Sequence, residues 1–301
     1  MWAISKRVFL FILTNILVMM TIGAIASVLQ MYFGISLDGK KGLLLMCALM
    51  GSVGSVFSLM TSKYMAKKAM KLQMIEGNTT DGELQWLKST VHNYAQKANL
   101  PKMPEVGIYD KAELNAFATG PSKSNSLVAV STGLLQKMER NEVEGVLAHE
   151  VAHIANGDMV TMTLIQGVVN TFVMFFAFIV SGLISSRLSE NGRGGHFVQF
   201  MVRQVLFVVF GIAGSVVTSA FSRHREFRAD HGGAKYAGKG KMIAALQALQ
   251  NNYAPTKPSR REAAIQSLKI SGKSGSFIKK IFCTHPPLEK RIRALQKTVM
   301  R

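Results

Sequence analysis

Long apolar runs alternate with charged stretches along this chain of 301 residues. The runs that hold few or no charged side chains are 8–29, 43–60, 159–184 and 204–221. A helix needs about 20 apolar residues to cross the hydrocarbon core of a bilayer, so each run is a candidate transmembrane helix. We therefore predict two transmembrane hairpins, 1–62 and 159–221, which are followed by polar stretches at 63–158 and 222–301.

Two of these assignments have an alternative. The first run contains Ala24-Ile25-Ala26, which resembles a signal-peptide cleavage site, but the chain stays apolar beyond it, and this favours an uncleaved anchor. The second pair of runs could instead form a buried helical hairpin of a soluble domain, because apolar runs of this length are ambiguous. Arg203 precedes the fourth run and could extend its side chain to the membrane interface.

The positive charges gather beside the apolar runs. The chain has 36 Lys and Arg against 17 Asp and Glu, which gives a net charge of +19. Basic residues flank both outer ends of the first hairpin, within Met1 to Arg7 and from Lys63 to Lys71. The positive-inside rule then places the N-terminus and both polar stretches in the cytoplasm. No nucleic acid is expected as a partner, because the basic residues lack the interleaved aromatic pattern of a nucleic-acid surface.

The polar stretches have the pattern of a soluble α+β domain. Residues at helical spacing predict an amphipathic helix over 81–99; they are Leu84, Leu87, Val91, Tyr94 and Ala98. Short strands are predicted at 105–109, 115–119 and 127–131, with turns at Gly120-Pro121 and at 122–125. The predicted fold is a mainly α membrane protein with four transmembrane helices and an α+β cytosolic domain that contains a small β-sheet.

A short helix at 132–138 leads into a longer helix with recognisable ends. Asn141 could cap this longer helix, with Glu144 completing a capping box, and Asn156-Gly157 could end it. Further along, 242–249 has a helical pattern, while 255–276 is rich in Lys, Ser and Gly and is predicted to be loosely packed.

The candidate chemistry lies in the longer helix. His149, Glu150 and His153 form the pattern H-E-x-x-H, and on a helix both imidazoles project from one face, about one turn apart. This spacing suits two ligands of a single zinc ion, with Glu150 placed to take a proton from the attacking water. The alternative is a chance occurrence on an ordinary buried helix, and a third ligand would decide against it.

Topology points to where a third ligand could come from. Two membrane crossings return the chain to the side it left, so the segment after Phe221 shares a compartment with the two histidines. Glu226 and Asp230 lie there, four residues apart and hence on one helical face. Glu226 could complete a His-His-Glu zinc site, and Asp230 could accept a hydrogen bond from a ligating histidine. The alternative is a solvated, charge-rich start of a helix.

Two further elements could serve this site. Asn115, Ala116, Phe117, Ala118 and Thr119 combine small residues with one aromatic, which suits an edge strand that a peptide substrate could join through main-chain hydrogen bonds. An ordinary core strand explains this segment equally well. His285 stands before two prolines that hold it in a stiff, non-helical turn, so it could support the site or the oxyanion, or simply begin a helix.

The two cysteines add no further site. Cys47 lies inside an apolar run and Cys283 is more than two hundred residues away, so we expect no disulfide and a reducing compartment. Without a cysteine pair at ligand spacing, a zinc-finger type of structural site is not expected either.

Several motifs together resemble the HtpX family of bacterial membrane metalloproteases. They are H-E-V-A-H followed by I-A-N-G-D, the apolar pair on each side, R-H-R-E-F-R-A-D after the second hairpin, and the late T-H-P-P-L-E. The resemblance covers nearly the whole chain and is far more specific than H-E-x-x-H alone. It implies a zinc endopeptidase of the bacterial inner membrane with one Zn²⁺ per chain, a zincin-like α+β cytosolic catalytic domain, and polypeptide substrates that are misfolded or damaged membrane proteins. It also implies a role in stress response and cooperation with other quality-control proteases.

The same resemblance implies residue roles. His149, His153 and Glu226 would be the zinc ligands and Glu150 the catalytic residue, with strand 115–119 binding the substrate and with Asp230 and His285 supporting the site.

Three other functions can be weighed against this interpretation. The wider family includes the CAAX prenyl proteases, so a prenyl-protein protease is the alternative within the enzymes. A non-catalytic zinc-binding membrane adaptor would be expected to carry a damaged motif, and all parts are intact here. A membrane metal carrier would place ionisable residues inside the apolar runs, which hold almost none.

Overall fold

The computed structural model describes most of the chain in two compact units. The described residues are 31–32, 39–76, 79–188, 195–253 and 285–298. One unit combines Met1–Val56 with Leu164–Ser215, and the other combines Phe57–Thr163 with Val216–Arg301. We call them the helical unit and the sheet unit. The predicted apolar run 8–29 and the segment 255–276 lie outside the described residues.

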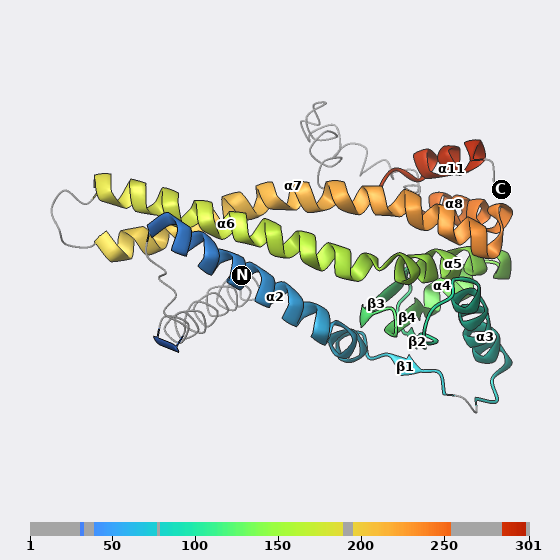
Figure 1. The fold of residues 1–301 in the computed structure, drawn as a ribbon. Coiled ribbons are helices and arrows are strands. Elements are labelled where there is room, and N and C mark those ends of the chain that lie inside the picture. Colours follow the sequence, from blue (N-terminus) through green and yellow to red (C-terminus); the bar gives the residue numbers. More distant parts are fainter. Residues whose placement is uncertain (1–30, 33–38, 77–78, 189–194, 254–284, 299–301) are drawn as a thin grey trace, which may run out of the picture. The chain divides into compact units, whose positions relative to one another are not determined.

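Three long helices, labelled in Figure 1, supply most of the described part of the helical unit, and each also has residues in the sheet unit. They are α2 (Gly39–Ala69), α6 (Asp158–Leu188) and α7 (Gly195–Ala237). Within the described residues, these three are the helices long and apolar enough to cross a membrane. Many of their apolar side chains are exposed, among them Leu44, Phe172 and Val208, as expected of side chains that face lipid. Of the four transmembrane helices that we predict, three are found here and the first falls on residues that are not described.

Small residues let α2 approach α6 closely. A Cβ atom added at Gly51 would lie 2.7 Å from the Thr171 hydroxyl of α6, so a larger residue has no room there. Gly54 has open space around it. Of the two glycines in the apolar run 43–60, Gly51 is the one that lies in close contact with α6.

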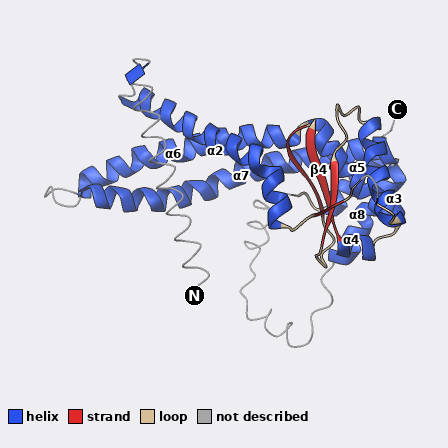
Figure 2. Cartoon of the chain, turned by 90° about the horizontal axis from the view of Figure 1, so that it is seen from below, coloured by secondary structure: helices blue, strands red, loops and turns tan. Residues whose placement is uncertain are grey.

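The sheet unit holds a four-stranded sheet within the described residues (Figure 2). Its strands are β1 (Gln73–Met74), β2 (Glu105–Tyr109), β3 (Ala116–Ser122) and β4 (Asn125–Ser131), in the order β1-β2-β4-β3. β2 and β4 are parallel, and the other neighbouring strands are antiparallel. Because β4 is apolar and almost wholly buried, it forms the middle of the sheet, while β3 is half-buried at the edge. β1 is too short for its sequence to predict it.

Two predictions about β3 are wrong. Gly120-Pro121 lie inside this strand, and the chain reverses after Ser122, which pairs with Asn125. A register shift after Thr119 absorbs the irregularity, and an edge strand can carry a proline because its outer N–H has no ladder partner. The strand therefore starts one residue later and runs further than the predicted 115–119.

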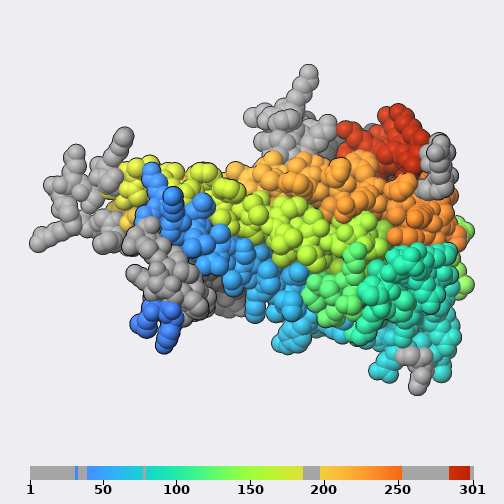
Figure 3. Space-filling view, viewed as in Figure 1, coloured from blue at the N-terminus to red at the C-terminus, as the bar shows by residue number. Residues whose placement is uncertain are grey.

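Shorter helices accompany this sheet within the described part of the unit. They are α3 (Gly82–Lys97), α4 (Thr132–Lys137), α5 (Arg140–Asn156), α8 (Lys239–Tyr253) and α11 (Leu288–Lys297). α3 is the helix predicted over 81–99, and the Asp81 side chain caps it by accepting from Glu83 N at 2.8 Å. α11 packs on α8 through Met242, Leu246 and Ile292, and it is red in Figure 3.

α5 lies in the middle of the unit and contacts α3, β3, β4 and α8. Its apolar residues Val143, Leu147, Val151 and Ile154 belong to the main core, so the helix is buried on several sides. Burial on this scale fixes the helix more firmly than its intrinsic propensity could.

The predicted cap of α5 is wrong. The helix begins earlier, after Glu139, whose backbone N–H donates to Glu142 Oε2 at 2.9 Å. Glu144 instead accepts a hydrogen bond from the Tyr94 hydroxyl at 2.8 Å and pairs with Lys241. The predicted end is right, since Gly157 has a left-handed backbone with φ of 69°.

Two glycines bring α7 against α5. A Cβ atom at Gly232 would lie 2.8 Å from Ala152 Cβ, and one at Gly233 would lie 3.1 Å from the backbone nitrogen of His149. This close approach carries the carboxylates of α7 to the histidine face of α5.

Candidate metal centre

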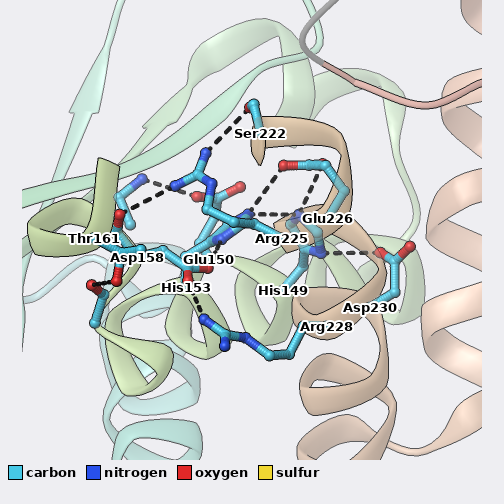
Figure 4. Close-up of polar contacts among 12 residues, drawn as sticks. His149, Glu150, His153, Asp158, Thr161, Ser222, Arg225, Glu226, Arg228 and Asp230 are labelled. Carbon is cyan, nitrogen blue, oxygen red and sulfur yellow. Dashed lines mark hydrogen bonds and ion pairs between the residues drawn. The ribbon is translucent and has the colours of Figure 1, made fainter. Parts of the chain in front are cut away.

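His149 and His153 of α5 meet Glu226 of α7 at one point (Figure 4). One ligand atom from each of the three lies within 4.8 Å of the others. The two Nε2 atoms are 3.1 Å apart. Glu226 Oε2 lies 3.6 Å from Nε2 of His149, and its Oε1 lies 3.4 Å from Nε2 of His153. Glu226 is only 1% exposed, so its charge is held away from water.

These separations fit a single divalent ion. Zinc binds imidazole nitrogen and carboxylate oxygen at about 2.0–2.1 Å, so two donors on a tetrahedral zinc ion are about 3.3–3.4 Å apart. The three observed separations lie on both sides of that value. Two imidazoles and a carboxylate also form the donor set of catalytic zinc sites that keep one position open.

A second carboxylate, that of Asp230, lies on the Nδ1 side of the His149 ring. The Nδ1 atom of His149 lies 3.0 Å from Asp230 Oδ1. Asp230 is buried, and the Arg291 guanidinium holds it through two hydrogen bonds of 2.6 and 2.8 Å. Arg291 also lies 3.2 Å from Glu226 Oε2. Burial lowers the pKa of Arg291, but the hydrogen bond with Asp230 outweighs burial and the pKa is raised.

His153 has a similar partner. Its Nδ1 lies 2.7 Å from Oδ2 of Asp158, the first residue of α6. The other oxygen of Asp158 accepts from Arg228 NH2 at 2.6 Å.

These carboxylates favour positive charge at the site. Burial by itself lowers the pKa of His149, but hydrogen bonds with Asp230 and Glu226 outweigh burial and the pKa is raised. Burial also opposes protonation of His153, yet hydrogen bonds with Asp158 and Glu226 raise its pKa to about 9. A field of buried anions that favours a proton also favours a metal cation, so the electrostatics and the donor geometry agree.

Glu150 lies beside this group and next to the edge strand. Its Oε2 accepts a hydrogen bond from the backbone N–H of Ala118 at 2.8 Å. Ala118 belongs to β3 with Ala116, Phe117 and Thr119. The structure therefore brings the glutamate of H-E-x-x-H together with the predicted substrate strand.

Asn115 and His285 complete the set of predicted residues. Asn115 precedes β3, and its backbone N–H donates to Ser131 Oγ at 3.1 Å while its carbonyl accepts from Ser131 N at 2.9 Å. His285 stands before α11, and its Nδ1 lies 2.8 Å from Glu226 Oε2. The His285 side chain is 64% exposed, so the imidazole is open to solvent on one side and bonded to Glu226 on the other.

Sequence reasoning missed Arg291 and Asp158. Arg291 follows Leu288 by three residues and precedes Leu295 by four, so it shares their buried helical face; an arginine on an apolar face is a detectable signal of a buried ion pair. Asp158 directly follows the glycine that ends α5, and only the turn geometry shows that its carboxylate returns to His153.

Comparisons with known proteins show the family of the chain. The model of peptidase family M48 matches residues 82–299. The chain is 49% identical over 296 residues to the Protease HtpX of Aeromonas hydrophila subsp. hydrophila, which covers 97% of this chain and 99% of that protein. It is 50% identical over 302 residues to the Protease HtpX homolog of Bacillus licheniformis, with coverage of 97% and 99%.

A solved structure has a similar fold. The crystal structure of S. mikatae Ste24p matches with a TM-score of 0.62 and 18% identity, over 94% of this chain and 66% of that chain. At this identity the likeness concerns the fold alone. The family model spans most of the chain and the relatives match nearly all of it, so this chain belongs to peptidase family M48.

Proposed function

We propose that this chain is a membrane-integrated, zinc-dependent endopeptidase that cleaves misfolded or damaged membrane proteins. The observation that carries the proposal is the meeting of His149, His153 and Glu226 at zinc-ligand separations, beside Glu150 and an edge strand. Membership of a metallopeptidase family supports peptide-bond hydrolysis, and the three apolar helices support a membrane setting.

Zinc is the ion that this donor set favours, because two imidazoles and a carboxylate are the protein ligands of catalytic zinc sites. Bound zinc supplies Lewis acidity to the peptide carbonyl and to the attacking water.

Glu150 moves the proton. Its carboxylate takes a proton from the attacking water and passes it to the nitrogen of the leaving amine. The Ala118 N–H donates to Oε2 of this carboxylate at 2.8 Å and so helps to orient it. Asp230 accepts from His149 Nδ1 and leaves Nε2 for the ion, while His285 donates from Nδ1 to Glu226.

Residues 116–119 of β3 bind the substrate as an added strand, through outward backbone groups other than the Ala118 N–H, which already donates to Glu150 Oε2. β3 is at the edge of the described sheet, and an extended peptide can bond to its backbone with little regard to side chains. Such recognition suits an enzyme that acts on many unfolded segments. Asn115 has no part in this pairing, because Ser131 already engages its backbone.

The site and the N-terminus face the cytoplasm of a bacterial inner membrane. This orientation rests on the lysines that follow the second apolar run, Lys63, Lys67, Lys68 and Lys71. Cooperation with other membrane quality-control proteases is part of the same proposal.

The prenyl-protein alternative is not favoured. The relatives that match nearly the whole chain at 49–50% identity are named HtpX, whereas Ste24p matches at 18% and supports the fold alone. A non-catalytic adaptor is not favoured either, because it would be expected to carry a damaged motif, and H-E-x-x-H and Glu226 are intact.

The Glu150→Gln variant tests the proposal in purified full-length protein. It should retain one zinc ion per chain and should cleave an unmodified, unfolded membrane protein more slowly, by about 10²-fold or more. The wild-type chain should cleave this substrate in preference to a farnesylated peptide. Near wild-type cleavage by Glu150→Gln, or a strong preference for the farnesylated peptide, would refute the proposal.

A further inference from the structure

His153 has a buried partner that the proposed function does not use. Asp158 is 0% exposed and starts α6, directly after the single glycine that ends α5. The left-handed backbone of Gly157 turns the chain so that Asp158 Oδ2 lies 2.7 Å from His153 Nδ1.

α7 holds the other side of Asp158. Arg228 NH2 donates to Asp158 Oδ1 at 2.6 Å, and Arg225 NH1 donates to the Asp158 backbone carbonyl at 3.3 Å. Arg225 also donates to Ser222 Oγ at 3.3 Å on its own helix. Glu226 stands between these two arginines in the sequence, so one turn of α7 supplies a predicted metal ligand and fixes Asp158 as well (Figure 4).

The contact decides which nitrogen of His153 can bind a metal. A neutral imidazole carries one proton, and the nitrogen that donates a hydrogen bond cannot also offer a lone pair. When Nδ1 donates to Asp158, Nε2 offers its lone pair, and Nε2 is the atom that faces Glu226 and His149. We propose, on the basis of the zinc site in the proposed function, that Asp158 is the positioning residue that fixes the ring and tautomer of His153, and that Arg228 holds Asp158 in place.

The second histidine has the same arrangement. His149, Asp230 and Arg291 form a chain from imidazole to carboxylate to guanidinium, and His153, Asp158 and Arg228 form another. Such outer partners of metal-binding histidines fix the ring orientation and raise ligand basicity. Each predicted imidazole ligand therefore has its own buried carboxylate.

A purely structural role for Asp158 is the competing explanation. Asp158 would then serve as an acid at the start of a helix and as a partner of Arg228, and its loss would affect stability alone. The Arg228 side chain is 54% exposed, so solvent screens the charge at its end of the pair, although Asp158 itself is buried. The His153 contact is shielded, since that side chain is 12% exposed, and it is therefore the stronger of the two.

Metal affinity separates the two roles. Full-length protein in detergent is stripped of metal, and zinc affinity is measured by competition with a coloured chelator; the absorption spectrum of bound Co²⁺ is measured in parallel. Asp158→Asn should weaken zinc binding about 10–100-fold and change the Co²⁺ spectrum. Arg228→Met, which leaves the His153 contact in place, should cause a smaller loss. Glu144→Gln is the matched control, because it removes a carboxylate that pairs with Lys241 without touching a ligand, and it should change neither readout.

The outcomes distinguish this inference from the proposed function. A wild-type chain that binds no zinc would refute the proposed function. Zinc binding by the wild type together with unchanged affinity and an unchanged Co²⁺ spectrum in Asp158→Asn would overturn the role of Asp158 alone. If zinc-stripped Asp158→Asn loses the cooperative thermal unfolding that the stripped wild type shows, Asp158 is a folding residue and the inference is overturned too.

Discussion

Arg291→Met should destabilise the sheet unit even without metal. Arg291 is 5% exposed and makes two hydrogen bonds to Asp230, and it also lies 3.2 Å from Glu226. Methionine fills much of the same volume but carries no charge. The variant therefore leaves two buried carboxylates without the guanidinium that offsets their charges.

The magnitude follows from this burial. Removing one partner of a buried ion pair costs about 3–5 kcal/mol, because the remaining charge cannot be solvated. A destabilisation of 1 kcal/mol lowers Tm by about 2–4 °C in a unit of 150–250 residues, so the expected decrease is about 6–20 °C. Arg293→Met is the control two residues along the same helix. Its partner Glu289 is 65% exposed and Arg293 is 70% exposed, so this change should cost at most about 0.5 kcal/mol.

Thermal unfolding of the zinc-stripped variants, followed by circular dichroism in detergent, measures the difference. A decrease in Tm for Arg291→Met that is no larger than the decrease for Arg293→Met would refute the reasoning. It would show that the Arg291 guanidinium does not stabilise the fold by offsetting the charges of Asp230 and Glu226.

Two further predictions concern the packing and charge of α5. Gly232→Ala should lower Tm, because its Cβ would lie 2.8 Å from Ala152 Cβ, and overpacking of about 1–3 kcal/mol exceeds the ~1 kcal/mol that alanine gains in a helix. Gly240→Ala in α8 has open space and should raise Tm slightly; a Tm for Gly232→Ala at or above the wild-type value would contradict the close contact. Glu144 should stabilise the fold in a pH-dependent way. Burial raises its pKa, but hydrogen bonds with Lys241 and Tyr94, with the charge of Lys97 nearby, outweigh burial and lower the pKa below 4.5. Its contribution is then present above pH 4.5 and is lost as the pH falls through the lowered pKa, so Glu144→Gln should flatten the acid side of the stability profile measured by thermal unfolding. An unchanged acid side would show that the pair with Lys241 does not form.

Local patterns predict the elements that carry the site. The apolar periodicity of α3, the buried run of β4 and the glycine that ends α5 each follow from a few neighbouring residues. The H-E-x-x-H spacing places both imidazoles on one helical face, and the two predicted membrane crossings would return Glu226 to the same side. This reasoning uses only helix periodicity and the order of the predicted membrane crossings, so the sequence alone predicts the ligand group.

Contacts between distant segments are not predictable in this way. Arg291 reaches Asp230 across sixty-one positions, and the sequence gives no register between α11 and α7. The pairing of β3 with Glu150 depends on how a sheet edge faces a helix, and the bulge near Gly120 shows how a turn signal can lie within a strand. The predicted cap of α5 is wrong because Asn141 is the better cap by residue type, whereas the helix starts after Glu139, where Glu142 completes the capping box.

The zinc content of Glu226→Gln tests the central claim most directly. After dialysis of the full-length chain against a weak chelator, elemental analysis should find one zinc ion per chain in the wild type and in Glu150→Gln, and far less than one in Glu226→Gln. Retention of one zinc ion by Glu226→Gln with wild-type affinity would contradict the claim that this carboxylate completes the site begun by His149 and His153.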